Sequence, residues 1–180
     1  MLTLIILLFL AYSFYTGARR GLALQAVYTG GYLVALVVAV VLAGVFQPLM
    51  QMWVPYPSAT ANSKMVFFGN NVALKLDSAF YYGVSFLFVL TICWALVRLG
   101  VLAVKHLEFV TYKDEIVNWL GAGVLNFICA YAFLFFVLYI LALIPVAGLQ
   151  HALQHSYGAL LMIRYTPIAS QLVANWWINA

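Results

Sequence analysis

Apolar residues along the chain are grouped into four long runs that contain no Asp, Glu, Lys or Arg. A helix of about 20 apolar residues crosses the hydrocarbon core of a bilayer. The first run is followed at once by Arg19 and Arg20, whereas a cleaved signal peptide carries its positive charge before the apolar stretch. The pattern therefore predicts an all-α integral membrane protein with four transmembrane helices, the first of them uncleaved. The predicted spans are at about residues 1–18, 22–46, 79–97 and 116–144.

The 47–78 connection has an amphipathic pattern. Its short apolar groups are flanked by Lys64, Lys75 and Asp77. This predicts an interfacial helix or hairpin resting on the membrane, although a loose loop with a few apolar contacts fits the pattern equally well.

The tail after Pro145 is amphipathic as well. A helix over 149–165 would place leucines on one side and polar residues, including Gln150, His151 and His155, on the other. We predict that this helix lies at the membrane interface, with a fifth crossing as the alternative. The expected organisation is one transmembrane domain over 1–145 and an interfacial amphipathic tail over 146–180.

The composition supports a membrane protein and excludes several other classes. Hydrophobic residues make up 67% of the chain, against about 45–50% in soluble domains, and charged residues make up 7%, against about 25%. A soluble globule could not cover so much apolar surface, which excludes a soluble enzyme, a disordered chain and a typical nucleic-acid-binding module. The net charge of +4 comes from scattered basic residues, so we expect membrane lipids and no nucleic acid as partners.

Lys and Arg are unevenly divided between the two sides of the predicted membrane. Cytoplasmic loops carry the excess of these residues, which predicts that both termini lie outside the cytoplasm. One side carries Arg19, Arg20, Arg98, Lys105 and Lys113, and the other carries Lys64, Lys75 and Arg164.

Few residues are candidates for chemistry. The spans contain no charged residue, so proton-coupled transport through an embedded carboxylate and intramembrane aspartyl proteolysis both lack their key group. His151 and His155 have the i, i+4 spacing of a metal-binding pair, but no Glu lies between them and no third ligand is nearby. We interpret them as part of a polar face, and we expect no catalytic residue, no metal and no cofactor. Cys93 and Cys129 lie in apolar runs and are interpreted as packing residues.

Small residues form the most informative pattern. Gly17 and Gly21 make a GxxxG motif around Arg19 and Arg20, and Gly121-Ala122-Gly123 lies near the start of the fourth span. Small residues let helices approach closely in lipid. Two uses remain open for these glycines, namely packing of the four helices within one chain and self-association into a homo-oligomer.

These motifs together resemble the colicin V production protein family of bacterial inner-membrane proteins. The resemblance covers most of the chain and rests on the motif around Gly17, on Asn118 followed by the glycines of the fourth span, and on Ser156 and Pro167 in the tail. The chain departs from the family pattern in having no acidic residue near the first span and Leu125 where a glycine is common, so it resembles a divergent member. The positions that match the family are Gly17, Arg19, Arg20, Gly21, Asn118, Gly121 and Gly123.

The resemblance implies a non-enzymatic protein of the bacterial inner membrane. Such a protein would support bacteriocin production or export, or envelope homeostasis, by self-association or scaffolding with secretion or envelope partners. The alternative is a small oligomeric channel or transporter, with Asn118 or Asn126 from several copies lining a constriction. A third hypothesis, a membrane enzyme, would use His151 and His155.

Overall fold

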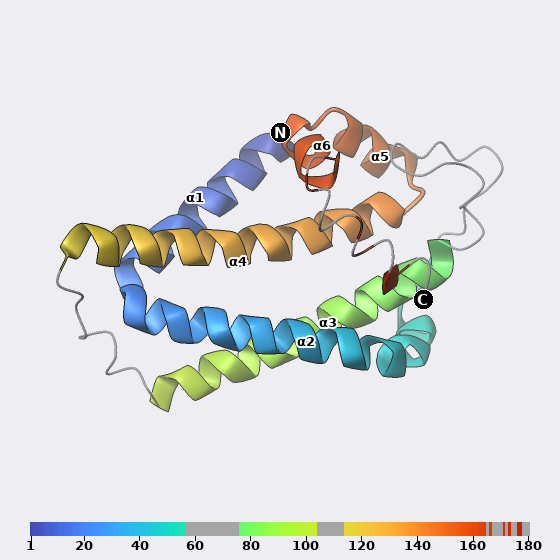
Figure 1. The fold of residues 1–180 in the computed structure, drawn as a ribbon. Coiled ribbons are helices and arrows are strands. Elements are labelled where there is room, and N and C mark those ends of the chain that lie inside the picture. The colour runs from blue at the N-terminus through green and yellow to red at the C-terminus, as the bar shows by residue number, and fades with distance from the viewer. Residues whose placement is uncertain are drawn as a thin grey trace. The chain divides into compact units, whose positions relative to one another are not determined.

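The computed structural model describes residues 1–56, 76–103, 114–164, 166, 171, 173 and 176–177. Four long helices come first: α1 (Leu2–Arg20), α2 (Leu22–Trp53), α3 (Leu76–Val101) and α4 (Glu115–Leu143), and the short helices α5 (Ala147–Gln154) and α6 (Tyr157–Arg164) follow (Figure 1). Each of the four long helices is long and apolar enough to cross a membrane. The predicted all-α fold with four spans is confirmed.

Most of the 47–78 connection, with Lys64 and Lys75, lies outside the described residues, as do Lys105, Lys113 and Pro167. The prediction of an interfacial segment there stays a prediction. The described part shows that α2 continues through Pro48 to Trp53, beyond the predicted end of the second span.

Contacts within the chain divide it into two compact units. Unit 1 comprises Met1–Ile6, Leu42–Leu87 and Phe135–Ala180, and unit 2 comprises Leu7–Val41 and Phe88–Leu134. Each of the four long helices therefore contributes residues to both units. The predicted division of the chain at residue 145 is not tested by this grouping and stays a prediction.

Unit 1 contains an aromatic core to which the end of the chain contributes Trp177. The Trp177 ring lies 5.8 Å from the Phe86 ring and 5.5 Å from the Tyr139 ring, measured between centroids. Gly83 makes this possible, because an added Cβ would stand 2.7 Å from the Trp177 indole. The described part of the tail is thus packed into unit 1.

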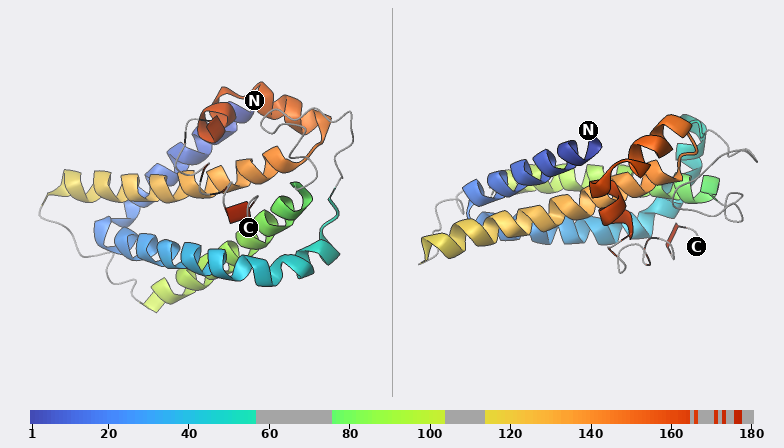
Figure 2. Two further views of the ribbon diagram at one scale, coloured as in Figure 1. Left: turned by 45° about the vertical axis from the view of Figure 1, so that its right-hand side comes forward. Right: turned by 90° about the horizontal axis from the view of Figure 1, so that it is seen from above.

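The tail contains two helices where the sequence predicted one over 149–165. The break falls at Ser156, whose backbone N–H bonds the Leu153 carbonyl and whose Oγ accepts a hydrogen bond from the Ala159 N–H, at the first turn of α6. The Ser156 Oγ also lies 3.0 Å from the Thr3 Oγ1, so α6 is held beside the first turn of α1 (Figure 2).

The placement of Gln150 on an exposed polar face was wrong. Gln150 is buried because its Nε2 donates hydrogen bonds to the Ala142 and Ile144 carbonyls, at 3.1 and 2.8 Å. The Ala142 carbonyl is among the last four of α4, which an α-helix leaves unpaired, and the Ile144 carbonyl lies just beyond the helix and also accepts from the Val146 N–H. The side chain therefore caps α4, which a helical projection of the tail alone does not reveal.

Tyr56, just after α2, also bonds the end of α4. Its hydroxyl donates to the Leu143 carbonyl at 2.9 Å, and its ring lies 4.8 Å from that of Phe80 between centroids. Burial, together with the nearby Asp77 carboxylate and Tyr81, raises the pKa of Tyr56 to about 12. The phenol therefore stays a neutral donor throughout the physiological range.

In unit 2, α2 turns small residues inward and branched ones outward. Ala35 and Ala39 are buried, whereas Leu33, Val34 and Val37 are more than half exposed. Apolar side chains gain nothing by leaving lipid, so membrane helices pack through small residues that permit close approach. This arrangement follows directly from the Ala- and Val-rich sequence of the second span.

Candidate functional site

The place where α1 meets α4 in unit 2 is built on glycine. A Cβ atom on Gly17 would stand 2.7 Å from the backbone carbonyl oxygen of Ala122 and still closer to the Cβ of Asn126. Gly123 likewise leaves room for Phe14, whose ring would be 2.7 Å from an added Cβ. These glycines therefore set a close crossing of two helices within one chain.

Gly21 and Asn118 are also brought together. Gly21 joins α1 to α2 with a φ of 79°, a region that L side chains rarely adopt. The Asn118 Oδ1 accepts a hydrogen bond from the Leu22 N–H at 2.9 Å, which satisfies one of the unpaired donors at the first turn of α2. Gly121 faces the same residue, because an added Cβ would stand 3.0 Å from the Leu22 Cδ1. The turn between α1 and α2 is thus fixed by α4.

The adjacent residues Arg19 and Arg20 have different surroundings. Arg19 is exposed, and its Nη1 lies 3.4 Å from the hydroxyl of Tyr15 as a donor. Arg20 is half-buried, and its guanidinium lies 4.8 Å from the centre of the Tyr28 ring. Of the pair, Arg20 lines the cavity described next.

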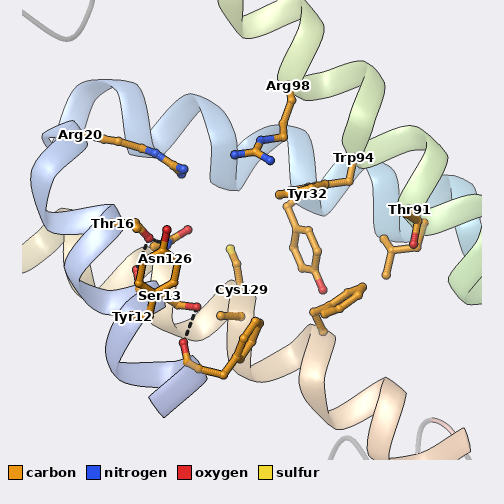
Figure 3. A pocket seen from close by; sticks show the side chains of 14 residues that line it. Tyr12, Ser13, Thr16, Arg20, Tyr32, Thr91, Trp94, Arg98, Asn126 and Cys129 are labelled. Carbon is orange, nitrogen blue, oxygen red and sulfur yellow. Dashed lines mark hydrogen bonds between the residues drawn. The ribbon is translucent and has the colours of Figure 1, made fainter. Parts of the chain in front are cut away.

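This cavity, of about 440 Å³, lies among the segments that all four long helices contribute to unit 2 (Figure 3). Its volume falls within the range of about 300–1,000 Å³ that is typical of ligand pockets. Its lining combines neutral polar, aromatic and basic side chains: Phe9, Tyr12, Ser13, Thr16, Arg20, Tyr32, Leu90, Thr91, Trp94, Arg98, Asn126, Cys129, Ala130 and Phe133.

Asn126 organises one wall of the cavity. Its Nδ2 donates to the Ser13 carbonyl and, at 3.3 Å, to the Thr16 Oγ1, while its Oδ1 accepts from the Gln25 Nε2 at 3.1 Å. The hydroxyls of Ser13 and Thr16 bond backbone carbonyls of α1. One asparagine therefore links α1, α2 and α4 and fixes the position of this wall.

Tyr32 is a buried lining residue whose hydroxyl lacks a partner among the described residues. Its side chain is 5% exposed, and its hydroxyl has no hydrogen-bond partner among the described residues. Figure 3 shows the ring pointing into the cavity from α2, in the region of Cys129 and Thr91. A buried hydroxyl without a partner costs about 1–3 kcal/mol. The Tyr32 hydroxyl is therefore a donor that a molecule in the cavity could satisfy.

Two arginines lie on the same side of the cavity. Arg20 ends α1 and Arg98 lies in the last turn of α3, and Figure 3 shows their guanidinium groups directed toward each other. The Arg98 guanidinium stacks on Trp94, 4.5 Å from the ring centre. No Asp or Glu is among the lining residues that the structure describes, so the site is positively charged at this side.

The paired histidines lie elsewhere, in unit 1. The rings of His151 and His155 are 4.0 Å apart between centroids, and both residues are exposed. The His155 Nδ1 lies 2.9 Å from the His151 carbonyl oxygen. Within the described part of the chain, no group of three His, Cys, Asp or Glu residues is placed to hold a metal ion.

Comparisons with known proteins match this arrangement to a family. Residues 2–167 match the family described as colicin V production protein, a span that contains both the glycine crossing and the cavity. The chain belongs to the colicin V production protein family. This family member is also 29% identical over 178 residues to the "Uncharacterized transmembrane protein YshB" of Bacillus subtilis (strain 168), covering 98% of this chain and 97% of that protein. No solved structure matches it.

In this colicin V production family protein, sequence reasoning found the glycines but not most of the cavity. It named Arg20 through the motif after the first span and Asn126 as a residue of the alternative channel. It did not name Tyr32, used Arg98 only to orient the chain in the membrane, and interpreted Cys129 as a packing residue. The available signal was weak, because each is an isolated polar or basic residue within or at the end of a long apolar run.

Proposed function

We propose that this protein is a non-enzymatic component of the bacterial inner membrane that binds a small solute in the cavity of unit 2. Its role would be to support bacteriocin production or export, or envelope homeostasis. Family membership supports the process, and the cavity supports solute binding. Both termini are proposed to lie outside the cytoplasm, because the side with Arg19, Arg20 and Arg98 carries more basic residues.

The observation that carries the proposal is the unpartnered Tyr32 hydroxyl in a cavity between helices that are long and apolar enough to cross a membrane. Polar groups within spans are expensive, and those that remain there usually mark a functional path. The Asn126 amide already has partners within the chain, whereas the Tyr32 hydroxyl has none among the described residues and would gain one from a ligand or water that enters. This favours the channel or transporter alternative over a purely packed bundle.

Cys129 provides a direct test, because it lines the cavity and Cys93 does not. The protein is reconstituted in lipid with Cys93 replaced by Ser, and a neutral, water-soluble methanethiosulfonate reagent is added. We expect modification of Cys129, slowed by Ala130→Phe, which places a large ring in the cavity. Ala11→Phe is the matched control, since Ala11 is exposed on α1 and does not line the cavity.

The same variants test whether the cavity is needed for the function of the protein in cells. In a strain that lacks the protein, wild type and Ala11→Phe are expected to restore bacteriocin release and resistance to envelope stress, and Ala130→Phe is not. Equal restoration by all three would show that the cavity has no part in the function.

Scaffolding by self-association is the second candidate, and one observation favours it. Gly30 on α2 has no atom within 4 Å of an added Cβ and lies beside the exposed Val27 and Val34. Gly17, Gly31 and Gly123 pack within the chain, so a contact between copies would use the Gly30 face instead. Native mass spectrometry in lipid nanodiscs tests this: an oligomer that Gly30→Leu dissociates supports it, and a monomer at every concentration contradicts it.

A further inference from the structure

The two arginines of unit 2 border two hollows, and this determines what a ligand meets. Besides the cavity that contains Tyr32, a second hollow of about 350 Å³ is lined by Arg20, Arg98, Tyr28 and the apolar residues Leu24, Leu99, Val101 and Leu102. Arg20 and Arg98 are the residues that the two hollows share. A ligand in either hollow therefore faces both guanidinium groups.

These guanidinium groups are positioned but not neutralised. Each lies over an aromatic ring, Arg20 over Tyr28 and Arg98 over Trp94, which favours this position of the cation. Neither forms a hydrogen bond or an ion pair with a described residue. Two like charges directed toward each other are unfavourable, and an anion between them would turn this repulsion into attraction.

We infer that Arg20 and Arg98 form a phosphate-binding site, and that a hydroxylated group attached to the phosphate enters the cavity beside Tyr32. This inference rests on the proposed solute-binding function and names the chemistry of its ligand. Two guanidinium groups suit a phosphate because each can donate two parallel hydrogen bonds to its oxygens. The arginines are at or near the ends of α1 and α3, the level at which lipid phosphates or soluble phosphate esters arrive.

The cavity beyond the arginines fits a neutral hydroxylated group. Its polar side chains include the unpartnered Tyr32 hydroxyl, the Thr16 hydroxyl and the Asn126 amide, and none of them carries a charge. Trp94 also lines the cavity, and its aromatic ring can cover the C–H faces of a glycerol or similar group. A glycerol phosphate unit contains both parts, whether free in solution or as the head group of phosphatidylglycerol.

The experiment measures binding to the full chain in nanodiscs of phosphatidylcholine. Soluble glycerol 3-phosphate and inorganic phosphate are titrated by calorimetry, and phosphatidylglycerol is added and counted by native mass spectrometry. We expect Arg20→Gln and Arg98→Gln each to weaken binding about tenfold, as expected for hydrogen bonds to a charged group. Arg19→Gln, which removes the same charge one residue away but outside the cavity, is expected to leave binding unchanged.

Tyr32→Phe separates the two parts of the ligand. This variant is expected to weaken the binding of glycerol 3-phosphate but not that of inorganic phosphate, because only glycerol 3-phosphate carries hydroxyls into the cavity. Arg98→Lys keeps the charge without the paired donors and is expected to bind more tightly than Arg98→Gln but less tightly than wild type. Binding of glycerol 3-phosphate identifies a soluble ester, and binding of phosphatidylglycerol alone identifies a lipid head group.

Several results would overturn the inference. They are the absence of binding by any of these phosphates, binding unaffected by both arginine variants, or an equal loss in Arg19→Gln. The neutral thiol reagent at Cys129 keeps this failure separate from that of the proposed function. If the reagent reaches Cys129 and no phosphate binds, the cavity is accessible and only its assigned ligand is wrong.

Discussion

Replacing glycine by alanine at Gly17 and at Gly30 tests whether the α1–α4 crossing is as close as the structure shows. Both residues lie in long helices of unit 2, so the backbone gains the same helix propensity, about 1 kcal/mol, at each. At Gly30 nothing lies within 4 Å of the added Cβ, whereas at Gly17 the Cβ would meet the Ala122 carbonyl oxygen at 2.7 Å. Overpacking of this kind costs about 1–3 kcal/mol.

The expected order of stability is therefore Gly30→Ala, then wild type, then Gly17→Ala. The two variants should differ by about 1–3 kcal/mol, because the propensity gain is common to both and only Gly17 has the clash. The measurement is reversible unfolding in mixed micelles, followed by circular dichroism. A Gly17→Ala protein as stable as Gly30→Ala would refute the close crossing, and a loss at Gly30 instead would show that this face is covered by another copy.

Three further predictions concern hydrogen bonds at helix ends. Asn118→Ala should lower the free energy of unfolding by about 1 kcal/mol in the same micelle assay, because the Leu22 N–H loses its acceptor. Asn118→Asp keeps an acceptor oxygen and should retain most of the wild-type stability. Gln150→Leu should destabilise by about 1–3 kcal/mol, because the Ala142 carbonyl of α4 loses its donor and the Ile144 carbonyl keeps only the Val146 N–H. The exposed Gln154→Leu should change little, and equal effects would contradict the cap. The stability difference between wild type and Tyr56→Phe should be constant below pH 10 and fall as pH rises toward 12, because the unfolded phenol ionises first; a difference that does not change with pH would contradict the burial of this hydroxyl.

The four spans could be predicted because a membrane imposes one solution on a long uncharged run. Without water, each backbone N–H and C=O must pair within the segment, which a helix achieves. The ends of the elements depend on tertiary contacts and could not be predicted in the same way. Ser156 breaks the tail helix where its hydroxyl meets Thr3 of α1, a residue far away in the sequence. Gln150 turns inward because its amide bonds the Ala142 carbonyl, which lies on another helix.

The candidate site divides along the same line. Gly17, Gly21 and Asn118 could be selected from sequence because they belong to short motifs whose order resembles a family. Tyr32 and Arg98 could not, since each meets the cavity through a fold that joins positions on separate helices. A single tyrosine in an apolar run has no local feature that distinguishes a cavity residue from one that faces lipid.

The spans contain no charged residue, and the same is true of the part of the cavity around Asn126 and Tyr32. These two features have one physical cause. A charged side chain at the centre of a bilayer costs about 2.5–3.5 kcal/mol on insertion scales, whereas neutral groups such as Asn126 and Tyr32 can be accommodated by local hydrogen bonds. The chain places its cations, Arg20 and Arg98, where α1 and α3 end and head groups compensate charge. A phosphate held between these arginines would bring no net charge into the cavity, because only the neutral hydroxylated group attached to it would enter. The anion would thus be recognised at the ends of α1 and α3, and its hydroxylated group would be bound further along the same helices. Neither task requires an ionised residue in the middle of the membrane.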